Sequence, residues 1–168
     1  MLFRGRSREP DKGAHTRDGD SEAALLDRVS GLCALWYFQR RLHEEVARCS
    51  RYGRPFALVV CELHLLPGDS ITDETVQRAG EIIRGGIRQT DLAACLDRST
   101  YVAMLVEAKP TVAATIAHRL KSELTLRVRS HRGPWKSGTA AFPDDGVDAD
   151  ALLNVAQRRL REDVSAAS

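Results

Sequence analysis

The chain has 168 residues, 43% of them hydrophobic, so it is long enough to bury one sizeable core and too apolar for a disordered protein. Lysine and arginine number 25 against 23 for aspartate and glutamate, and a formal net charge of +2 gives no electrostatic case for nucleic acid as the partner. No apolar run approaches the roughly 18 residues of a membrane span, and the N-terminus lacks the apolar stretch of a signal peptide, so we expect a single-domain cytoplasmic protein.

The two ends of the chain differ in composition from the rest. Residues 1–20 are charged and nearly free of large apolar side chains, with acids alternating among the arginines. Such a segment buries too little apolar surface to fold, so residues 1–20 are predicted to be a disordered tail, as are residues 165–168. A basic arm for a partner or a membrane surface is the alternative for the first segment. Residues 21–164 then form the folded domain.

Two helical patterns open this domain. Apolar residues at helical spacing run through residues 21–32 and again through 36–49. A continuous apolar run over 56–61 predicts a central strand covered on both faces. We expect Trp36 and Tyr37 to lie in the core, with packing on a partner helix as the alternative.

A turn, a helix and a hairpin follow. Residues 67–69 read Pro-Gly-Asp and predict the turn, after which Asp73 is placed to cap a helix. The apolar face of that helix consists of Val76, Ala79, Ile82, Ile83 and Ile87. Apolar runs over 92–96 and 101–106 then predict two strands, and Asp97 opens a four-residue connection that favours a type I turn.

The last third of the chain predicts a helix over 111–124, a strand over 138–142 and a final helix. The inward face of the first helix is expected to consist of Val112, Ile116, Ala117 and Leu120. Either Asp148 or Asp150 can cap the final helix. This order of elements indicates an α/β (α+β) domain whose central, mostly antiparallel sheet is flanked by helices.

The four cysteines are Cys33, Cys49, Cys61 and Cys95, and no two of them form a CxxC pair. None has the spacing to a histidine that a zinc site needs, so we expect buried, reduced thiols. No metal ion and no other cofactor is expected.

Five segments of the chain, in order, resemble the GGDEF family, the diguanylate cyclase domains. Residues 27–32 resemble the family's opening motif Asp-x-Leu-Thr-Gly-Leu, and residues 54–64 resemble its first strand, which ends in Asp-x-Asp. Residues 97–101 stand at the signature turn, which in the family reads Gly-Gly-Asp/Glu-Glu-Phe. The resemblance covers about residues 22–163 and implies the palm-like fold of nucleotide cyclases.

The resemblance also implies that the active site is degenerate. The family's active-site positions are occupied here by Glu62, His64, Asp73, Asp97, Arg98, Ser99, Thr100 and Tyr101. Asp97 and Arg98 add side chains where phosphate approaches bare backbone, and Glu62 lacks the partner carboxylates of a two-metal site. Asp73 stands at the guanine-reading position, with a plain helix cap as the alternative. We therefore expect no enzyme activity; residual cyclase activity centred on Glu62 is the least favoured reading.

One ligand site survives in the pattern. Family members carry an inhibitory site for cyclic di-GMP made of an Arg-x-x-Asp pair and a further arginine, and these positions correspond to Arg88, Asp91 and Arg119. An arginine fork suits phosphate oxygens and guanine edges, and a carboxylate accepts from guanine N–H groups. The resemblance therefore implies an inactive GGDEF domain that acts as a cyclic di-GMP receptor, with a signalling protein as partner and a homodimer left open. The alternatives are a helix-end ion pair between Arg88 and Asp91, and an interaction module that binds no nucleotide.

Overall fold

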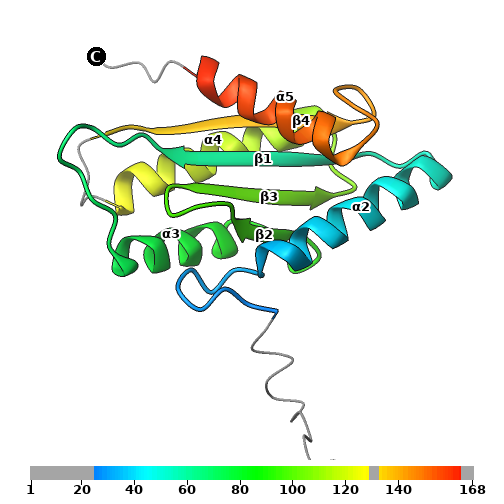
Figure 1. The fold of residues 1–168 in the computed structure, drawn as a ribbon. Coiled ribbons are helices and arrows are strands. Elements are labelled where there is room, and N and C mark those ends of the chain that lie inside the picture. The colour runs from blue at the N-terminus through cyan, green and yellow to red at the C-terminus, as the bar shows by residue number, and fades with distance from the viewer. Residues whose placement is uncertain (1–24, 129–132, 164–168) are drawn as a thin grey trace, which may run out of the picture.

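The computed structural model describes residues 25–128 and 133–163, which form helices and strands interspersed along the chain (Figure 1). The elements are α2 (Leu35–Tyr52), β1 (Phe56–Leu63), α3 (Asp73–Gly85), β2 (Leu92–Cys95), β3 (Thr100–Val106), α4 (Pro110–Arg127), β4 (Trp135–Phe142) and α5 (Ala149–Glu162). The predicted tails at 1–20 and 165–168 lie outside the described residues. No helix in the described ranges is long and apolar enough to cross a membrane.

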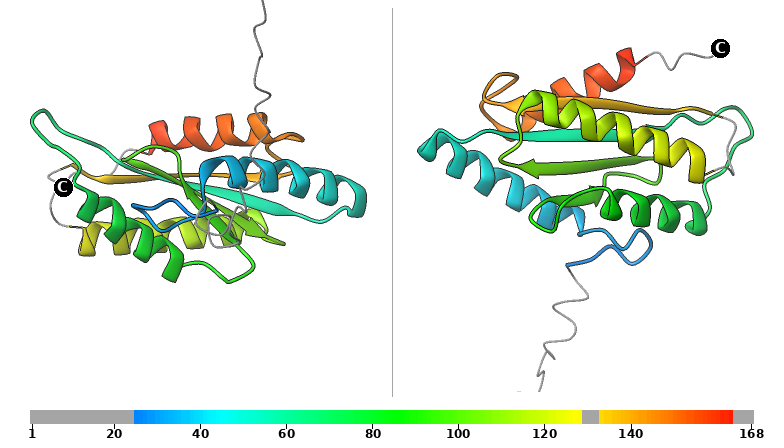
Figure 2. Two further views of the ribbon diagram at one scale, coloured as in Figure 1. Left: turned by 60° about the horizontal axis from the view of Figure 1, so that its bottom comes forward. Right: turned by 180° about the vertical axis from the view of Figure 1, so that it is seen from behind.

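The strands form one sheet in the order β2-β3-β1-β4, and every neighbouring pair is antiparallel. Helices α2 and α5 cover one face and α3 and α4 cover the other (Figure 2). Successive residues of β1 serve the two faces in turn: Leu58 packs toward α2 and α5, whereas Val59 packs toward α3 and α4. Burial on both faces explains the continuous apolar run of β1, and the predicted helix-flanked antiparallel sheet is confirmed.

The predicted helix over 21–32 is wrong for the residues that the structure describes. Residues 25–33 form a turn (the opening turn), closed by a bridge between Leu26 and Cys33. Oδ1 of Asp27 accepts hydrogen bonds from the N–H and the hydroxyl of Ser30, at 2.7 and 2.6 Å, and Gly31 has a left-handed φ of 66°. These local side-chain bonds and the left-handed glycine compete with helix formation, which the apolar spacing alone does not reveal.

Other expectations need smaller corrections. Thr72 rather than Asp73 caps α3, since its side chain accepts from the N–H of Thr75, while Asp148 does cap α5. Trp36 is 52% exposed because it lies about 200° around α2 from the buried Phe38. On α4, Val112 is exposed rather than inward.

The cysteines agree with the expectation of buried thiols, except that Cys95 is only half-buried. All four are free, and burial raises the pKa of Cys61 to about 12 and those of the other three to about 11. The thiols are therefore neutral at physiological pH.

Candidate functional site

The signature turn, residues 97–101, connects β2 to β3 and is held by its own side chains. Oδ1 of Asp97 accepts from the N–H and the hydroxyl of Ser99, both at 2.8 Å. Tyr101 is buried, and its hydroxyl donates to the carbonyl of Arg98 at 3.2 Å. Because burial disfavours the phenolate, the pKa of Tyr101 is raised. The side chains of Asp97, Ser99 and Tyr101 thus form hydrogen bonds within the turn itself.

Arg98 reaches from this turn to the start of α3. Its Nη2 donates to Oδ1 of Asp73 at 2.5 Å and to the carbonyl oxygen of Ile71 at 3.1 Å. Two sequence-predicted positions, Arg98 and Asp73, are therefore brought together, but in an ion pair with each other. An arginine side chain bridges the turn and the helix start.

The end of β1 lies beside the same turn, since the N–H of Leu63 donates to the carbonyl of Ser99 at 2.9 Å. Glu62 is half-buried, and its cross-strand neighbours are Thr100 on β3 and Lys136 on β4. Neither of these neighbouring residues is an acid. His64 is exposed beyond the strand, with its backbone N–H on the carbonyl of Pro134. Within the described residues, no group of three or more acid, histidine or cysteine side chains could hold a metal ion.

The second predicted group lies at the other end of α3. Asp91 is 8% exposed; its Oδ2 accepts from the backbone N–H of Arg88 at 2.9 Å and its Oδ1 from the N–H of Val106 at 3.0 Å. The expected alternative of a helix-end ion pair is therefore not what forms, because Asp91 binds the backbone of Arg88 and not its guanidinium. The carboxylate joins the loop after α3 to the end of β3.

Arg88 and Arg119 share a hollow of about 370 Å³ between the end of α3 and α4, the Arg119 hollow. It is also lined by Gly86, Val112 and Ile116. Arg119 donates to the carbonyl of Gly86, whereas the Arg88 guanidinium has no hydrogen-bond or ion-pair partner among the described residues. Both side chains are exposed.

Asp91 does not line that hollow. It lines an adjoining one of about 350 Å³, the Asp91 hollow, together with Arg88 and Arg84. Arg88 is thus common to both hollows, and Arg84 is a residue that the sequence analysis missed. Its only signal in the sequence is a second arginine four residues before Arg88.

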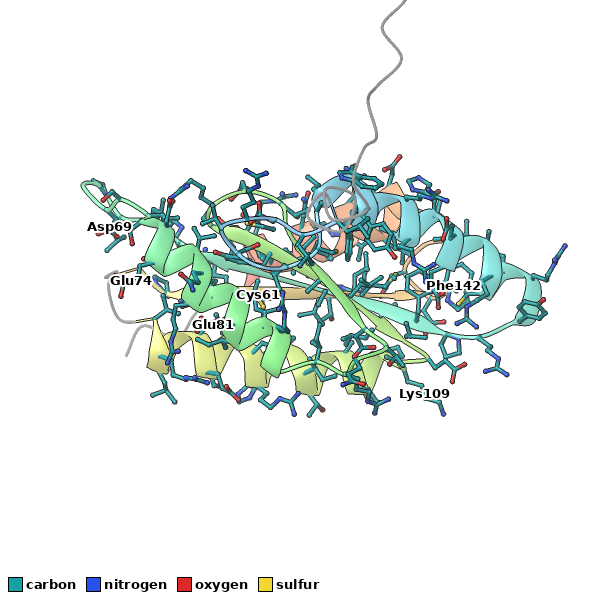
Figure 3. The ribbon with its side chains drawn as sticks, turned by 90° about the horizontal axis from the view of Figure 1, so that it is seen from below. Cys61, Asp69, Glu74, Glu81, Lys109 and Phe142 are labelled. Atoms are coloured by element: carbon teal, nitrogen blue, oxygen red, sulfur yellow. The ribbon has the colours of Figure 1, made fainter. Side chains whose placement is uncertain are left out.

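The two groups are well separated. Seen from below, α3 runs from the loop that contains Asp69 past Glu74 and Glu81 (Figure 3). Helix α3 has 13 residues and is about 20 Å long, with Asp73 at its first position and Arg84 near its last. A hollow of about 630 Å³ nevertheless runs beside the helix and is lined by both Asp73 and Arg84.

Comparison with known proteins gives consistent matches. The family model described as diguanylate cyclase, GGDEF domain, matches residues 24–166. The diguanylate cyclase DgcS of Shewanella oneidensis is 26% identical over 147 residues, which are 83% of this chain and 49% of DgcS. The chain thus spans about half the length of that curated relative.

Solved structures share the fold at lower identity. The GGDEF domain of DgcB from Caulobacter crescentus, in complex with cyclic di-GMP, matches with a TM-score of 0.70 and 18% identity over 83% of this chain and 89% of that chain. The diguanylate cyclase SiaD from Pseudomonas aeruginosa, in complex with its activator SiaC, matches with a TM-score of 0.72 and 17% identity over 86% and 59%. The four-stranded antiparallel sheet with its flanking helices is common to these structures and the present chain.

Proposed function

Since this chain belongs to the GGDEF family of diguanylate cyclase domains, we propose that it acts in cyclic di-GMP signalling as a catalytically inactive receptor. The ligand site of this proposal consists of Arg88, Asp91 and Arg119. The single observation that carries it is the contrast between the two ends of α3. At the Asp73 end, Arg98 forms an ion pair with Asp73. At the other end, the Arg88 guanidinium is exposed and has no partner among the described residues.

Loss of catalysis is supported by what surrounds the signature turn. Joining two GTP molecules requires phosphates and divalent cations to approach this region, and each needs a particular surrounding. Arg98 spans from the turn to Asp73, and the β4 residue across from Glu62 is Lys136, a cation and not a carboxylate. Incubation of the protein with GTP and Mg²⁺ tests this half of the proposal: no cyclic di-GMP should form, and measurable product in the assay would overturn the claim of inactivity.

Ligand binding at the other end is supported by its chemistry. Two exposed guanidinium groups, Arg88 and Arg119, line one hollow, and planar forks of this kind pair with phosphate oxygens and guanine edges. A structural neighbour, the GGDEF domain of DgcB, was solved in complex with cyclic di-GMP.

Titration calorimetry with cyclic di-GMP tests the receptor half. The proposal expects saturable binding that also raises the melting temperature, because a ligand that binds only the native state stabilises it. Arg88→Ala should abolish the heat, whereas Arg51→Ala, an exposed arginine on α2, should bind like the unchanged protein. Absence of heat and of any melting shift at saturating ligand would remove the receptor role.

A second function, an interaction module that binds no nucleotide, is favoured by one observation. Both carboxylate oxygens of Asp91 already accept backbone N–H groups, so the residue has a structural use without any ligand. A neighbour of the same fold, SiaD, was solved in complex with a protein activator. This function predicts no calorimetric response to cyclic di-GMP and a stable complex with a signalling protein from the native cell. A homodimer, the cytoplasmic location and the domain limits 21–164 stay predictions.

A further inference from the structure

Arg84 lines the same hollow as Asp91. The Asp91 hollow, of about 350 Å³, is bounded by Arg84, Arg88 and Asp91 on its polar side. Its apolar lining includes Leu26, Ile87 and Leu92, and Leu26 is 50% exposed. Guanidinium groups beside a carboxylate and an apolar wall offer a nucleotide three kinds of contact: to phosphate, to base-edge donors and to the base face.

The Arg84 side chain is not used by the fold. It is exposed and has no hydrogen-bond or ion-pair partner in the part of the chain that the structure describes. Its Nη2 lies near Gly31, where an added Cβ would be 3.5 Å away. The guanidinium therefore lies against the opening turn, between that turn and α3, and also lines the neighbouring hollow of about 630 Å³.

Arg119 is placed differently from Arg84. It lines the Arg119 hollow, on the other side of Arg88, and donates to the carbonyl of Gly86. Among the described residues, only Arg84 and Arg88 provide guanidinium groups to the hollow that contains Asp91. A cyclic dinucleotide has two phosphates and two bases, so one molecule can engage the hollows on both sides of Arg88.

We propose that Arg84 is a further ligand-binding residue, which holds a phosphate of the cyclic dinucleotide in the Asp91 hollow while Asp91 accepts from the guanine. This inference rests on the proposed receptor function and adds a residue to its site. The chemistry is that of a guanidinium fork on a phosphate, which gives a stronger hydrogen bond than a neutral donor does.

The test compares matched arginine variants by titration calorimetry with cyclic di-GMP. Arg84→Gln should weaken binding by about tenfold or more, the factor expected for one lost charge-assisted bond. Arg78→Gln removes the same charge from the same helix outside these hollows, where its partner is Glu81. It should bind within about twofold of the unchanged protein, since an exposed i,i+3 ion pair contributes little.

The possible failures are distinguishable. If the unchanged protein binds and Arg84→Gln binds equally well, the inference about Arg84 is wrong and the receptor function stands. If Arg78→Gln weakens binding as much as Arg84→Gln does, the effect is one of overall charge and the inference is again wrong. If the unchanged protein does not bind, the receptor function falls and this inference falls with it. Equal melting temperatures of the variants without ligand show that both are folded.

Discussion

At the scale of single residues, Asp91 and Arg88 belong to one sequence motif but have different roles: Asp91 stabilises the fold, and the Arg88 side chain is available for a ligand. Asp91 is buried and its carboxylate accepts two backbone N–H groups, whereas the Arg88 side chain is exposed. We expect Asp91→Ala to lower the free energy of unfolding by about 2 kcal/mol, because two part-buried backbone N–H groups lose a charged acceptor. Arg88→Ala should change it by less than about 0.5 kcal/mol. Urea unfolding of both variants checks this, and equal losses would contradict it.

Glu107 provides a second prediction at this scale. It has a φ of 52°, which L residues adopt at a cost, and its ion pair with Arg54 is half exposed on both sides. Both Glu107→Gly and Glu107→Ala remove the pair, but only glycine relieves the backbone. The glycine variant should therefore be more stable than the alanine variant by about 1 kcal/mol in thermal unfolding. An alanine variant as stable as the glycine variant would show that this position is unstrained.

Which residues share a hollow is not contained in the sequence pattern. The gapless alignment of Arg88, Asp91 and Arg119 predicted one group, and the structure divides it between two hollows with Arg88 in common. Arg84 enters the site because the loop after α3 turns back beside the opening turn, a long-range arrangement that no local pattern encodes. The hydrogen bond from the N–H of Val106 to Asp91 was not predictable for the same reason, since 15 residues separate the two in the sequence.

At the scale of elements, the contact between the opening turn and α3 depends on a missing side chain. A Cβ on Gly80 would lie 2.0 Å from the backbone oxygen of Ser30, whereas a Cβ on Gly85 would meet no atom within 4 Å. Helix propensity alone predicts that alanine stabilises either position, by up to about 1 kcal/mol. We expect Gly80→Ala instead to destabilise the protein by about 1–3 kcal/mol, because backbone must move. Gly85→Ala is the control and should be neutral or slightly stabilising.

The pair distinguishes packing from propensity. Chemical denaturation of the two variants measures both effects on the same helix. A Gly80→Ala variant as stable as the unchanged protein would mean that the opening turn does not rest on α3.

Regular elements were predictable where one pattern dominated. The apolar run of β1 and the helical spacing in α2 indicated the correct element types. A strand buried on both faces has a continuous apolar sequence, whereas a helix buried on one face has apolar residues every three or four positions. The opening turn was not predictable from spacing, since Asp27 and Ser30 form a local hydrogen-bonded turn within an apolar pattern of helical period. The resemblance to the opening motif marked this segment but not its conformation.

At the scale of the whole molecule, two carboxylates accept hydrogen bonds from backbone N–H groups of β4, a strand at the edge of the sheet. Asp163 accepts from the N–H of Ser137 and from Lys121, and Asp145 accepts from the N–H of Ala141 and from Arg159. Bonding to Arg159 holds the pKa of Asp145 below its ordinary value. Burial opposes ionisation of Asp163, but its bonds from Ser137 and Lys121 outweigh this and lower its pKa.

These shifts predict how stability depends on pH. A carboxyl group whose pKa is lower in the folded state stabilises the fold above its unfolded pKa, and that contribution is lost as pH falls through the folded value. The free energy of unfolding should thus be level near neutrality and fall below about pH 4. In Asp145→Asn the free energy of unfolding should fall less on acidification, because the variant lacks one carboxyl group whose pKa is lowered in the folded state. Urea titrations at several pH values measure this, and a stability that rises on acidification would contradict it.

We propose that the domain binds cyclic di-GMP at the Arg88 end of α3, while at the other end Arg98 forms an ion pair with Asp73. A crystal structure of the protein grown with cyclic di-GMP tests this most directly. We expect the dinucleotide in the hollows beside Arg84 and Arg88, with the ion pair between Arg98 and Asp73 intact. A dinucleotide seated between residues 97–101 and the start of α3, with Arg98 displaced, would contradict it.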